Sequence, residues 1–409
     1  IMTDNNENKV LNVPHLRFPE FSGEWEIYPL TDFMSFKNGM NPDAKRFGRG
    51  TKFISVMDIL NNQFICYDNI RASVEVVDGD IETYGVNYGD ILFQRSSETL
   101  EDVGQANVYL DSKPAVFGGF VIRGKSKSNY YPMFFRYLLA SPTARKKIIV
   151  KGAGAQHFNI GQDGLSKVCL NIPSIQEQEK IAKLFECIDT RIATQNKIIE
   201  DLKKLKSAIS KHLFARKDLL ETTICLSNIA TLKNGYAFQS GKYNALGKWK
   251  ILTITNVSGE RYINDEDYNC IINLPNDIQD HQVLKEGDIL ISLTGNVGRV
   301  SLCKDGDYLL NQRVGLLQLA KNVNQEFLYQ ILSSQKFENS MIACGQGAAQ
   351  MNIGKGDVES YVLPYSSNGN NILWIAKILH SYDECIINEQ RRLTLLTMQK
   401  QYLLTQMFI

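Results

Sequence analysis

The amino-acid sequence predicts an α+β fold that occurs twice in one chain, with a long helix after each copy. First, a glycine-rich decapeptide is repeated: GAGAQHFNIG at 152–161 returns as GQGAAQMNIG at 345–354, with six of ten residues identical. Second, four more blocks recur in the same order: FKNG at 36–39 and LKNG at 232–235, YGDIL at 88–92 and EGDIL at 286–290, IPS at 172–174 and LPYS at 363–366, IAKL at 181–184 and IAKI at 375–378. Third, each copy ends in a stretch with apolar residues at seven-residue spacing. The repeat is too long for a solenoid and indicates two homologous halves, about 22–217 and 222–409.

The repeated blocks divide the chain into five segments. They are an N-terminal tail (1–21), a first α+β domain (22–173), a central long helix (174–217), a second α+β domain (218–366) and a C-terminal long helix (367–409).

Within both domains, short β-branched runs beside turns predict strands. They are KFISVMDI, GDILFQ and AVFGGFVIRG in the first domain and KWKILTITNV, GDILISLTG and VGLLQL in the second. Apolar residues at helical spacing predict one helix over 129–149 and another over 324–342.

The two long helices show the pattern of helices that pack on another long helix. Ile181, Ile188, Leu202 and Ile209 share one seam in the first helix, and Ile375, Tyr382, Leu396 and Leu403 share the second. Polar Gln195 and Glu389 interrupt these seams at equivalent positions, where such residues can fix register at some cost in stability. We expect an antiparallel coiled coil of about 39 residues, roughly 58 Å long, that separates the two domains. The alternative is that each helix is buried in its own domain.

Composition excludes several classes of protein. The chain has 44% hydrophobic and 22% charged residues and a net charge of +1, as ordinary soluble proteins do. It lacks an apolar run of eighteen residues, and its polar start lacks the apolar core of a signal peptide. Its eight cysteines include no C-x-x-C pair, which argues against a zinc site or a disulfide framework. We expect a cytoplasmic protein without a membrane partner.

The sequence contains no recognisable catalytic motif. G-x-x-x-x-G-K-[ST], H-E-x-x-H, G-x-S-x-G and the Asn-Pro-Pro-aromatic tetrapeptide of adenine methyltransferases are all absent. The decapeptide has the wrong glycine spacing for a dinucleotide fingerprint. A duplicated chain without a duplicated acid, base or nucleophile indicates a binding protein. We expect no catalytic residue, metal site or cofactor in this chain.

Positive charge is concentrated in the first domain. Residues 37–52 contain five Lys or Arg residues and one acid, and residues 113–151 contain nine Lys or Arg residues and no acid. Such stretches are typical of phosphate-contacting faces, although solvated faces fit the charge as well. The candidates here are Lys37, Asn38, Lys45, Arg46, Arg49, Lys52, Arg123 and Lys151.

The second domain lacks this excess, because residues 225–366 hold twelve Lys or Arg residues and fourteen Asp or Glu residues. DNA contacts there would depend on individually placed side chains, and Asn, Gln and Arg can pair bidentately with base edges. The candidates are Lys233, Asn234, Tyr236, Phe238, Gln239, Lys242, Asn256, Ser292, Thr294, Asn296, Arg299, Gln312, Arg313, Gln350 and Asn352.

Two interpretations of the decapeptide stay open. Gly152 and Gly154 permit a tight turn or the close approach of a partner, and Ile160 would anchor the loop. A purely structural turn and a DNA-contacting loop fit this segment equally well.

The combined motifs resemble the specificity (S) subunit of Type I restriction-modification systems. The matching features are VPHLRFPEF at 13–21, FKNG and LKNG, GDIL, the glycine-rich loop ending in NIG, and IPSIQEQEKIAKLFECID before the long helix. The resemblance covers nearly the whole chain. One departure is that the second copy, LPYSSNGNNILWIAKIL, lacks the pair corresponding to Glu177 and Gln178.

The resemblance implies two target-recognition domains that read a bipartite sequence in double-stranded DNA, with antiparallel helices as a ruler. It implies two modification (methyltransferase) subunits and motor-nuclease restriction subunits as partners. S-adenosylmethionine, ATP and Mg²⁺ are expected on those partners, so that the assembled complex would be an adenine methyltransferase and an ATP-dependent restriction endonuclease. Candidates for base reading in the first domain are Arg95, Ser96, Ser97, Gln105, Gln156, His157 and Asn159.

Two rival functions remain at this stage. The first is a scaffold whose coiled coil joins two protein-binding modules without DNA specificity; the basic stretch over 113–151 argues mildly against it. The second is an unusual nuclease or methyltransferase, for which the sequence offers no cofactor motif.

Overall fold

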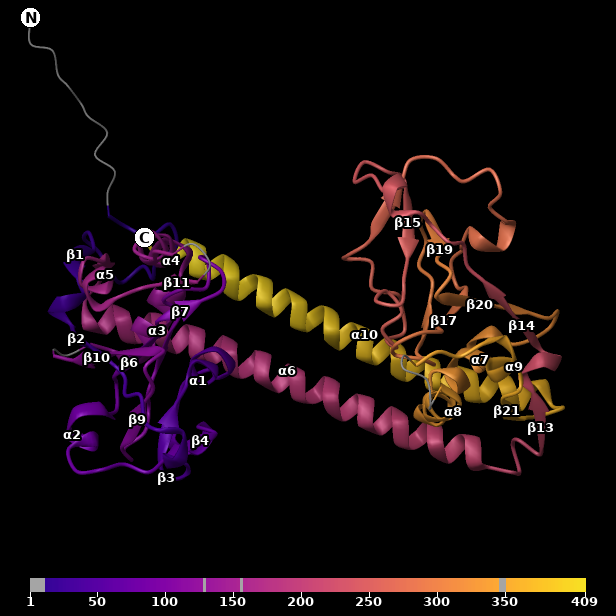
Figure 1. Ribbon diagram of the computed structural model, residues 1–409, viewed down its shortest axis with the longest axis horizontal. Helices are drawn as coiled ribbons and strands as arrows, with labels where there is room; N and C mark the ends of the chain where they lie inside the picture. The colour runs from indigo at the N-terminus through magenta and orange to yellow at the C-terminus, as the bar shows by residue number, and fades with distance from the viewer. Residues whose placement is uncertain (1–11, 128–129, 155–156, 346–350) are drawn as a thin grey trace, which may run out of the picture. The chain divides into compact units, whose positions relative to one another are not determined.

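The computed structural model describes residues 12–127, 130–154, 157–345 and 351–409. The chain divides into two compact units. The first contains residues 1–195 and 392–409, and the second contains residues 196–391. Each unit holds one α+β domain and one segment of each long helix (Figure 1).

The first domain is built on two four-stranded sheets with strand orders β2-β10-β6-β8 and β4-β3-β9-β5. Two short antiparallel pairs, β1 with β12 and β7 with β11, complete it. Its elements are β1 (Glu26–Pro29), β2 (Met34–Asn38), β3 (Phe47–Ile54), α1 (Val56–Asn61), β4 (Ala72–Val74), α2 (Asp80–Tyr84), β5 (Gly85–Val86), β6 (Ile91–Gln94), β7 (Ser96–Ser97), β8 (Ala106–Val108), β9 (Ala115–Phe117), β10 (Val121–Ser126), α3 (Pro132–Ala140), α4 (Pro142–Ile149), β11 (Phe158–Asn159), α5 (Gln162–Ser166) and β12 (Cys169–Ile172).

The second domain repeats this plan with the sheet β14-β20-β17-β18, the sheet β16-β15-β19 and the pair β13 with β21. Its elements are β13 (Thr222–Cys225), β14 (Ala230–Asn234), β15 (Trp249–Leu252), β16 (Asn269–Ile271), β17 (Ile289–Ser292), β18 (Val300–Leu302), β19 (Tyr308–Leu310), β20 (Val314–Leu319), α7 (Gln325–Leu332), α8 (Gln335–Gly345), α9 (Lys355–Glu359) and β21 (Val362–Tyr365). The predicted α+β class and its duplication are therefore confirmed.

The long helices are α6 (Ile175–Ala215) and α10 (Gly369–Gln406). In the first unit the beginning of α6 lies against the end of α10, because Phe185 and Phe408 have ring centroids 5.7 Å apart. In the second unit the end of α6 lies against the beginning of α10, where Leu213 and Ile375 share one core. The two helices are thus antiparallel within each unit, as the sequence predicts.

The end of each long helix belongs to a domain core. Phe408, near the end of α10, is 2% exposed and contacts Trp25 and Phe134 of the first domain at centroid distances of 6.4 and 5.6 Å. Phe214, near the end of α6, contacts Phe327 of the second domain at 6.2 Å. Each helix therefore contributes apolar side chains to the core of a domain.

Three local predictions were wrong. The single helix expected over 129–149 is interrupted, because Ser141 is extended before Pro142 and ends α3, after which α4 begins. The helix expected over 324–342 is likewise divided into α7 and α8. The strand expected over KFISVMDI ends at Ile54, since Ser55 and Asp58 form a capping box that starts α1.

Candidate nucleic-acid interface

The repeated KNG motif ends the first strand of each principal sheet where the backbone passes close to a neighbouring turn. A Cβ atom on Gly39 would lie 2.0 Å from the carbonyl oxygen of Gly118, and one on Gly235 would lie 2.2 Å from that of Asn311. The amide of Tyr236 donates to Leu310 at 2.8 Å across this contact. Only glycine fits at Gly39 and Gly235, so the motif fixes a turn next to the strand pair β9–β10 or β19–β20.

The repeated GDIL motif forms the same turn twice. Gly89 and Gly287 have φ angles of +88° and +86°, in the left-handed region that favours glycine. The carboxylate of Asp90 accepts from the amide of Asn87 at 3.0 Å, and Asp288 accepts from Lys285 at 2.8 Å. Burial raises the pKa of both carboxyl groups. These aspartates set the entry into β6 and β17.

The decapeptide holds the loop that leaves β6 or β17. Ser96 donates its hydroxyl to Asn159 in the first domain, and Thr294 donates to Asn352 at 3.1 Å in the second. The amides of Ile160 and Ile353 donate to Arg95 and Leu293, both at 2.9 Å, and both isoleucines are buried. The asparagine and isoleucine of NIG thus explain the repetition in structural terms, although both asparagines stay exposed.

Three loops meet at this point in each domain, and we call them the three-loop cluster. In the first domain it comprises residues 95–97, 118–120 and 157–159; in the second it comprises 293–295, 311–313 and 351–352. The amide of Arg95 donates to Phe120 at 2.9 Å, and the amide of Leu293 donates to Arg313 at 3.0 Å. The same backbone scaffold therefore presents different side chains in the two domains.

The middle loop differs most between the two clusters. The first domain has Gly119 and Phe120 where the second has Gln312 and Arg313. Phe120 is 69% exposed, against 43% for Phe47, the next most exposed phenylalanine among the described residues. Sequence reasoning missed Phe120. The signal that could have identified it is its alignment with Arg313, since the two residues follow the corresponding buried strands β9 and β19.

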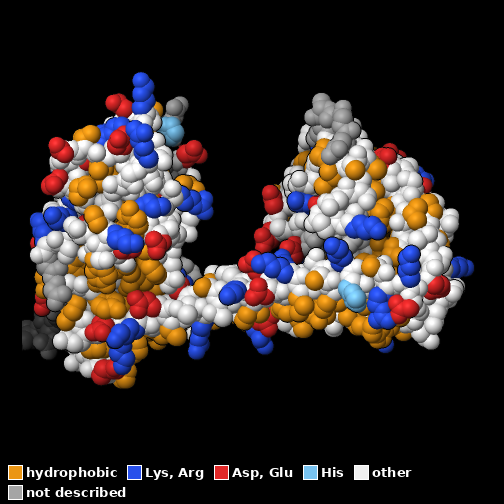
Figure 2. All heavy atoms as spheres, turned by 90° about the horizontal axis from the view of Figure 1, so that it is seen from below, with side chains coloured by type: hydrophobic (Ala, Val, Ile, Leu, Met, Phe, Trp, Pro, Cys, Tyr) orange, Lys and Arg blue, Asp and Glu red, His pale blue; other side chains and the backbone are white. Residues whose placement is uncertain are grey.

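Two of the five basic residues over 37–52 are compensated by acids from elsewhere in the domain. Arg46 pairs with Asp80, and Arg49 pairs with Glu75 at 2.8 Å. Lys52 donates to the carbonyl of Ile70 at 2.7 Å. Lys37 lies over the ring of Tyr84, Asn38 ends β2, and Lys45 is exposed. On the face that Figure 2 shows, Lys and Arg side chains are interspersed with Asp and Glu.

Three arginines of the stretch over 113–151 are held inside the first domain. Arg123 is 5% exposed and donates to the carbonyl of Gly85, and burial lowers its pKa. Arg136 donates to Asn107 at 3.1 Å, and Arg145 donates to Val103 at 2.7 Å. Exposed lysines of this stretch include Lys125, Lys127, Lys146 and Lys151. The positive face is therefore smaller than the sequence count indicates.

Three predicted contact residues are not at the surface. Besides Arg123, Asn256 is 2% exposed and Ser292 is fully buried. The amide of Asn256 donates to Asn264 and Asp267, both at 2.8 Å, and its oxygen accepts from Thr253. The hydroxyl of Ser292 donates to Asn296. Asn256 and Ser292 use these groups within the domain, and Arg123 is buried, so we remove these three residues from the candidate interface.

Other candidates lie inside or beside the clusters. The candidates that belong to the three-loop clusters are Arg95, Ser96, Ser97, His157, Asn159, Thr294, Gln312, Arg313 and Asn352. Asn296 lies two residues after Thr294, and Gln105 is hydrogen-bonded to Asp102. Two candidates, Lys233 and Asn234, end β14. The candidates that follow this strand are Tyr236, Phe238, Gln239 and Lys242, and Tyr236 is bonded to Asp277 and packed on Phe238. Arg299 instead faces Glu338 of α8 at 3.5 Å. Gln156 and Gln350 lie outside the described residues.

The described part of the chain offers no group of His, Cys, Asp and Glu side chains that could hold a metal ion. Nor does any described helix have the length and apolarity to cross a membrane.

Comparison with known proteins identifies the duplicated unit. The model of the Type I restriction modification DNA specificity domain matches residues 22–204 and again residues 221–398. The Type I restriction enzyme MjaVIII specificity subunit of Methanocaldococcus jannaschii is 25% identical over 351 residues, which cover 80% of this chain and 78% of that relative. The putative MjaX specificity subunit of the same organism is 26% identical over 372 residues, with 84% of each chain covered.

Solved structures share the fold. The crystal structure of a Type I restriction-modification S subunit from M. genitalium aligns over 97% of this chain and 99% of its own, with a TM-score of 0.55 and 16% identity. A chain from a structural study of the assembly and conformational transition of the type I R-M system aligns over 93% of this chain and 96% of its own, with a TM-score of 0.58 and 12% identity. Because the domain model matches most of both halves, the chain belongs to the Type I restriction-modification DNA specificity family and carries two copies of its domain.

Proposed function

We propose that the chain reads a bipartite target in double-stranded DNA, one half-site through each three-loop cluster. The observation that carries this proposal is that one loop scaffold is built twice from the same motifs but ends in different side chains. A shared scaffold with variable tips suits two readers of different base sequences.

The side chains of the middle loops, 118–120 and 311–313, suggest that the two domains recognise bases in different ways. Arg313 and Gln312 are exposed and can form bidentate hydrogen bonds with guanine and adenine edges in the major groove. Phe120 offers an apolar surface, which suits the methyl group of thymine. The exposed lysines after β10 and α4 would contact phosphates and fix the position of the domain without reading sequence.

We further propose that methyltransferase subunits dock on the outer faces of the long helices and that restriction subunits join the same complex. In support, Leu395, Met398 and Tyr402 form an apolar stripe on α10, with exposures of 65%, 62% and 57%. The equivalent positions of α6 are Asp201, Lys204 and Ala208, so the two faces differ in chemistry. S-adenosylmethionine, ATP and Mg²⁺ would bind to the partners, and this chain would determine the DNA sequence at which they act.

The rival scaffold without DNA specificity is not favoured by the family match. A domain exchange tests the choice. Residues 222–366 are replaced by those of a relative with another target, the chain is co-expressed with its methyltransferase subunit, and methylated adenines are mapped across a genome. One half-site should change and the other should stay. A map that changes in both halves would show joint reading, and one that does not change would contradict the proposed role of the second domain.

A further inference from the structure

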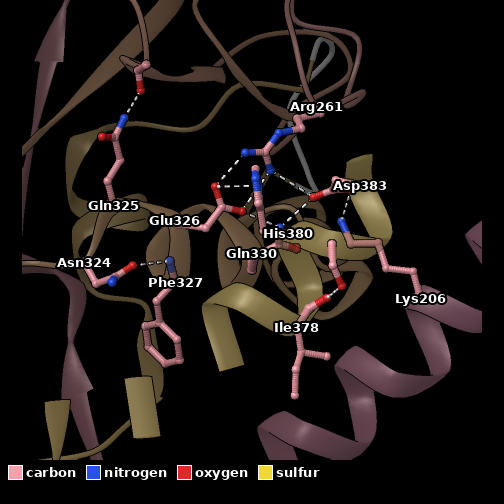
Figure 3. A network of polar contacts seen from close by, with 12 residues as sticks. Lys206, Arg261, Asn324, Gln325, Glu326, Phe327, Gln330, Ile378, His380 and Asp383 are labelled. Carbon is pink, nitrogen blue, oxygen red and sulfur yellow. Dashed lines mark hydrogen bonds and ion pairs between the residues drawn. The ribbon is translucent and has the colours of Figure 1, made fainter. Parts of the chain in front are cut away.

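A buried polar cluster joins the two long helices in the second unit (Figure 3). Asp383 of α10 is 6% exposed and accepts from Lys206 of α6 at 2.6 Å. It also accepts from Gln330 of α7 at 2.6 Å and from Arg261 at 2.9 Å. Glu326 of α7 completes the cluster, because it binds both terminal nitrogens of Arg261 at 2.8 and 2.6 Å. We call this the Asp383 cluster.

The first unit contains a matching Asp189 cluster. Asp189 of α6 is 8% exposed and accepts from Lys400 of α10 at 2.5 Å. Tyr137 of α3 donates its hydroxyl to the other oxygen of Asp189 at 2.8 Å, and Lys400 lies 5.7 Å from the centre of the same ring. Gln63 is hydrogen-bonded to Tyr137.

The two clusters are copies of one arrangement. Asp383 follows Asp189 by 194 residues, and Lys400 follows Lys206 by the same 194 residues. Gln330 of α7 corresponds to Tyr137 of α3 at an offset of 193. In both units an aspartate on one long helix binds a lysine on the other long helix and a donor from the recognition domain.

Both clusters define the same register between α6 and α10. In two antiparallel helices, facing positions have residue numbers with a constant sum. The paired positions 189 and 400 have the sum 589, and so do the paired positions 206 and 383. A shift of one helix by one heptad would move each lysine by about 10 Å along the axis. The apolar seam would tolerate that shift, because Ile and Leu recur along it. The aspartates would not, since a buried carboxylate without its partner is strongly destabilising.

We propose that Asp189 with Lys400 and Asp383 with Lys206 are positioning residues that select one register of α6 against α10 and thereby set the spacing between the half-sites. The spacing part of this inference rests on the proposed function. The recognition domains take part, because Tyr137, Gln330 and Arg261 bind the same aspartates.

The Asp189 cluster allows a charge-inversion test, since no arginine donates to Asp189 among the described contacts. The full-length variants are Asp189→Lys, Lys400→Glu and the double variant with both. Gln401→Glu is the matched control, because it adds an acid at the exposed neighbour of Lys400. Lys400→Gln is a milder variant for the case that Lys400→Glu does not fold.

The first measurement is thermal unfolding, which needs no DNA. Each single inversion should lower the unfolding midpoint by about 6 °C or more, and the double variant should recover most of the loss. Gln401→Glu should leave the midpoint unchanged. Two single effects that simply add in the double variant would refute the pairing, as would a wild-type midpoint in both Lys400→Glu and Lys400→Gln.

The second measurement is the methylation map of the complex with its methyltransferase subunit. Folded single variants, including Lys400→Gln, should lose about tenfold or more of the methylation at sites with the wild-type spacer, and the double variant should regain it. A folded single variant with wild-type methylation at the wild-type spacer would overturn the spacing role. If wild-type protein directs no bipartite methylation at all, the proposed function fails, while the unfolding measurement still decides whether the register contact exists.

Discussion

At the scale of single residues, the repeated polar positions build turns. Asp58 and Asn256 occupy the same place in the two domains, and each accepts a hydrogen bond at 2.7 Å from the amide three residues earlier, Ser55 or Thr253. One is a carboxylate and the other an amide, so a shared acceptor oxygen is what the turn requires. Positions that differ within a shared scaffold, such as Phe120 and Arg313, are the better candidates for base reading.

Replacing Arg313 by Ala should relax base preference at one position of the half-site read by the second domain. A lost bidentate contact to guanine is worth about 1–3 kcal/mol of discrimination. The methylation map should therefore show a degenerate base at one position, with the other half-site and the spacer unchanged. Arg299→Ala is the matched control, because that arginine faces Glu338 at 3.5 Å. If the Arg313→Ala variant methylates the same DNA sequence as the wild type, Arg313 does not read a base.

The sequence predicts the location of the candidate site better than its members. NIG, GDIL and KNG were found as repeats, and NIG and KNG do meet at the three-loop clusters. The GDIL turn lies at the opposite end of β6 or β17, where the strand begins. Charge counts along the chain overestimated the basic face, because Arg46 and Arg49 find Asp80 and Glu75 more than twenty-five residues away. Burial of Arg123 depends on a neighbouring strand and cannot be predicted from adjacent residues.

At the scale of elements, the two long helices begin with different anchors. Glu177 in the first turn of α6 is 1% exposed and accepts from Arg17 at 2.7 Å through each oxygen. The second copy lacks this glutamate, but Glu221 from the segment before β13 accepts from the amide of Ser367 at 2.6 Å and from the hydroxyl of Ser366 at 2.7 Å. A carboxylate still anchors the start of α10, although it comes from another part of the chain.

Glu177→Gln should destabilise the first unit by about 3 kcal/mol, because it leaves the guanidinium of Arg17 without its ionic partner. The measurement is denaturant unfolding of the full chain, and Glu179→Gln is the control, since Glu179 is exposed and pairs with Lys183 of the same helix. Equal midpoints for the two variants would show that the Arg17 contact adds no stability.

The anchor of α10 adds a pH dependence with a defined sign. Hydrogen bonds from the Ser367 amide and the Ser366 hydroxyl lower the pKa of Glu221 to about 2 from its usual 4.5. Because the folded state binds the ionised form, this stabilisation is complete above pH 4.5 and is lost as the pH falls toward about 2.

Element lengths were predictable where one period dominates. The sequence indicated a central long helix over 174–217, and α6 spans Ile175–Ala215. The break between α3 and α4 was missed although Pro142 was visible, because the apolar spacing continues across it. The Asp189 and Asp383 clusters were also missed. Their signal was present as Asp and Lys pairs at a constant offset of 194 residues, but their partners on α3 and α7 required the fold.

At the scale of the whole molecule, the duplication repeats one packing arrangement, in which the end of a long helix completes the core of a domain. The end of α10 completes the core of the first domain with Phe408, and the end of α6 contributes Phe214 beside Phe327 of the second. Each domain therefore needs the helix that follows the other domain. The two halves cannot be separated into independent modules without removing apolar side chains from both cores.

If the helices set the spacer, lengthening both by the same amount should lengthen the spacer without changing either half-site. The two ion pairs define which residues of α6 and α10 face each other. In that register, the peptide bond that follows Ile199 in α6 faces the peptide bond that follows Glu389 in α10. Four helix-forming residues inserted at both points add about 6 Å and rotate the two ends of the coiled coil by about 40°. At about 3.4 Å per base pair, the spacer should grow by one or two base pairs. Insertion in α6 alone should abolish methylation, because it displaces Lys206 relative to Asp383 while Asp189 keeps Lys400. A folded double-insertion variant that methylates sites with the original spacer would show that the length of these helices does not determine the distance between half-sites.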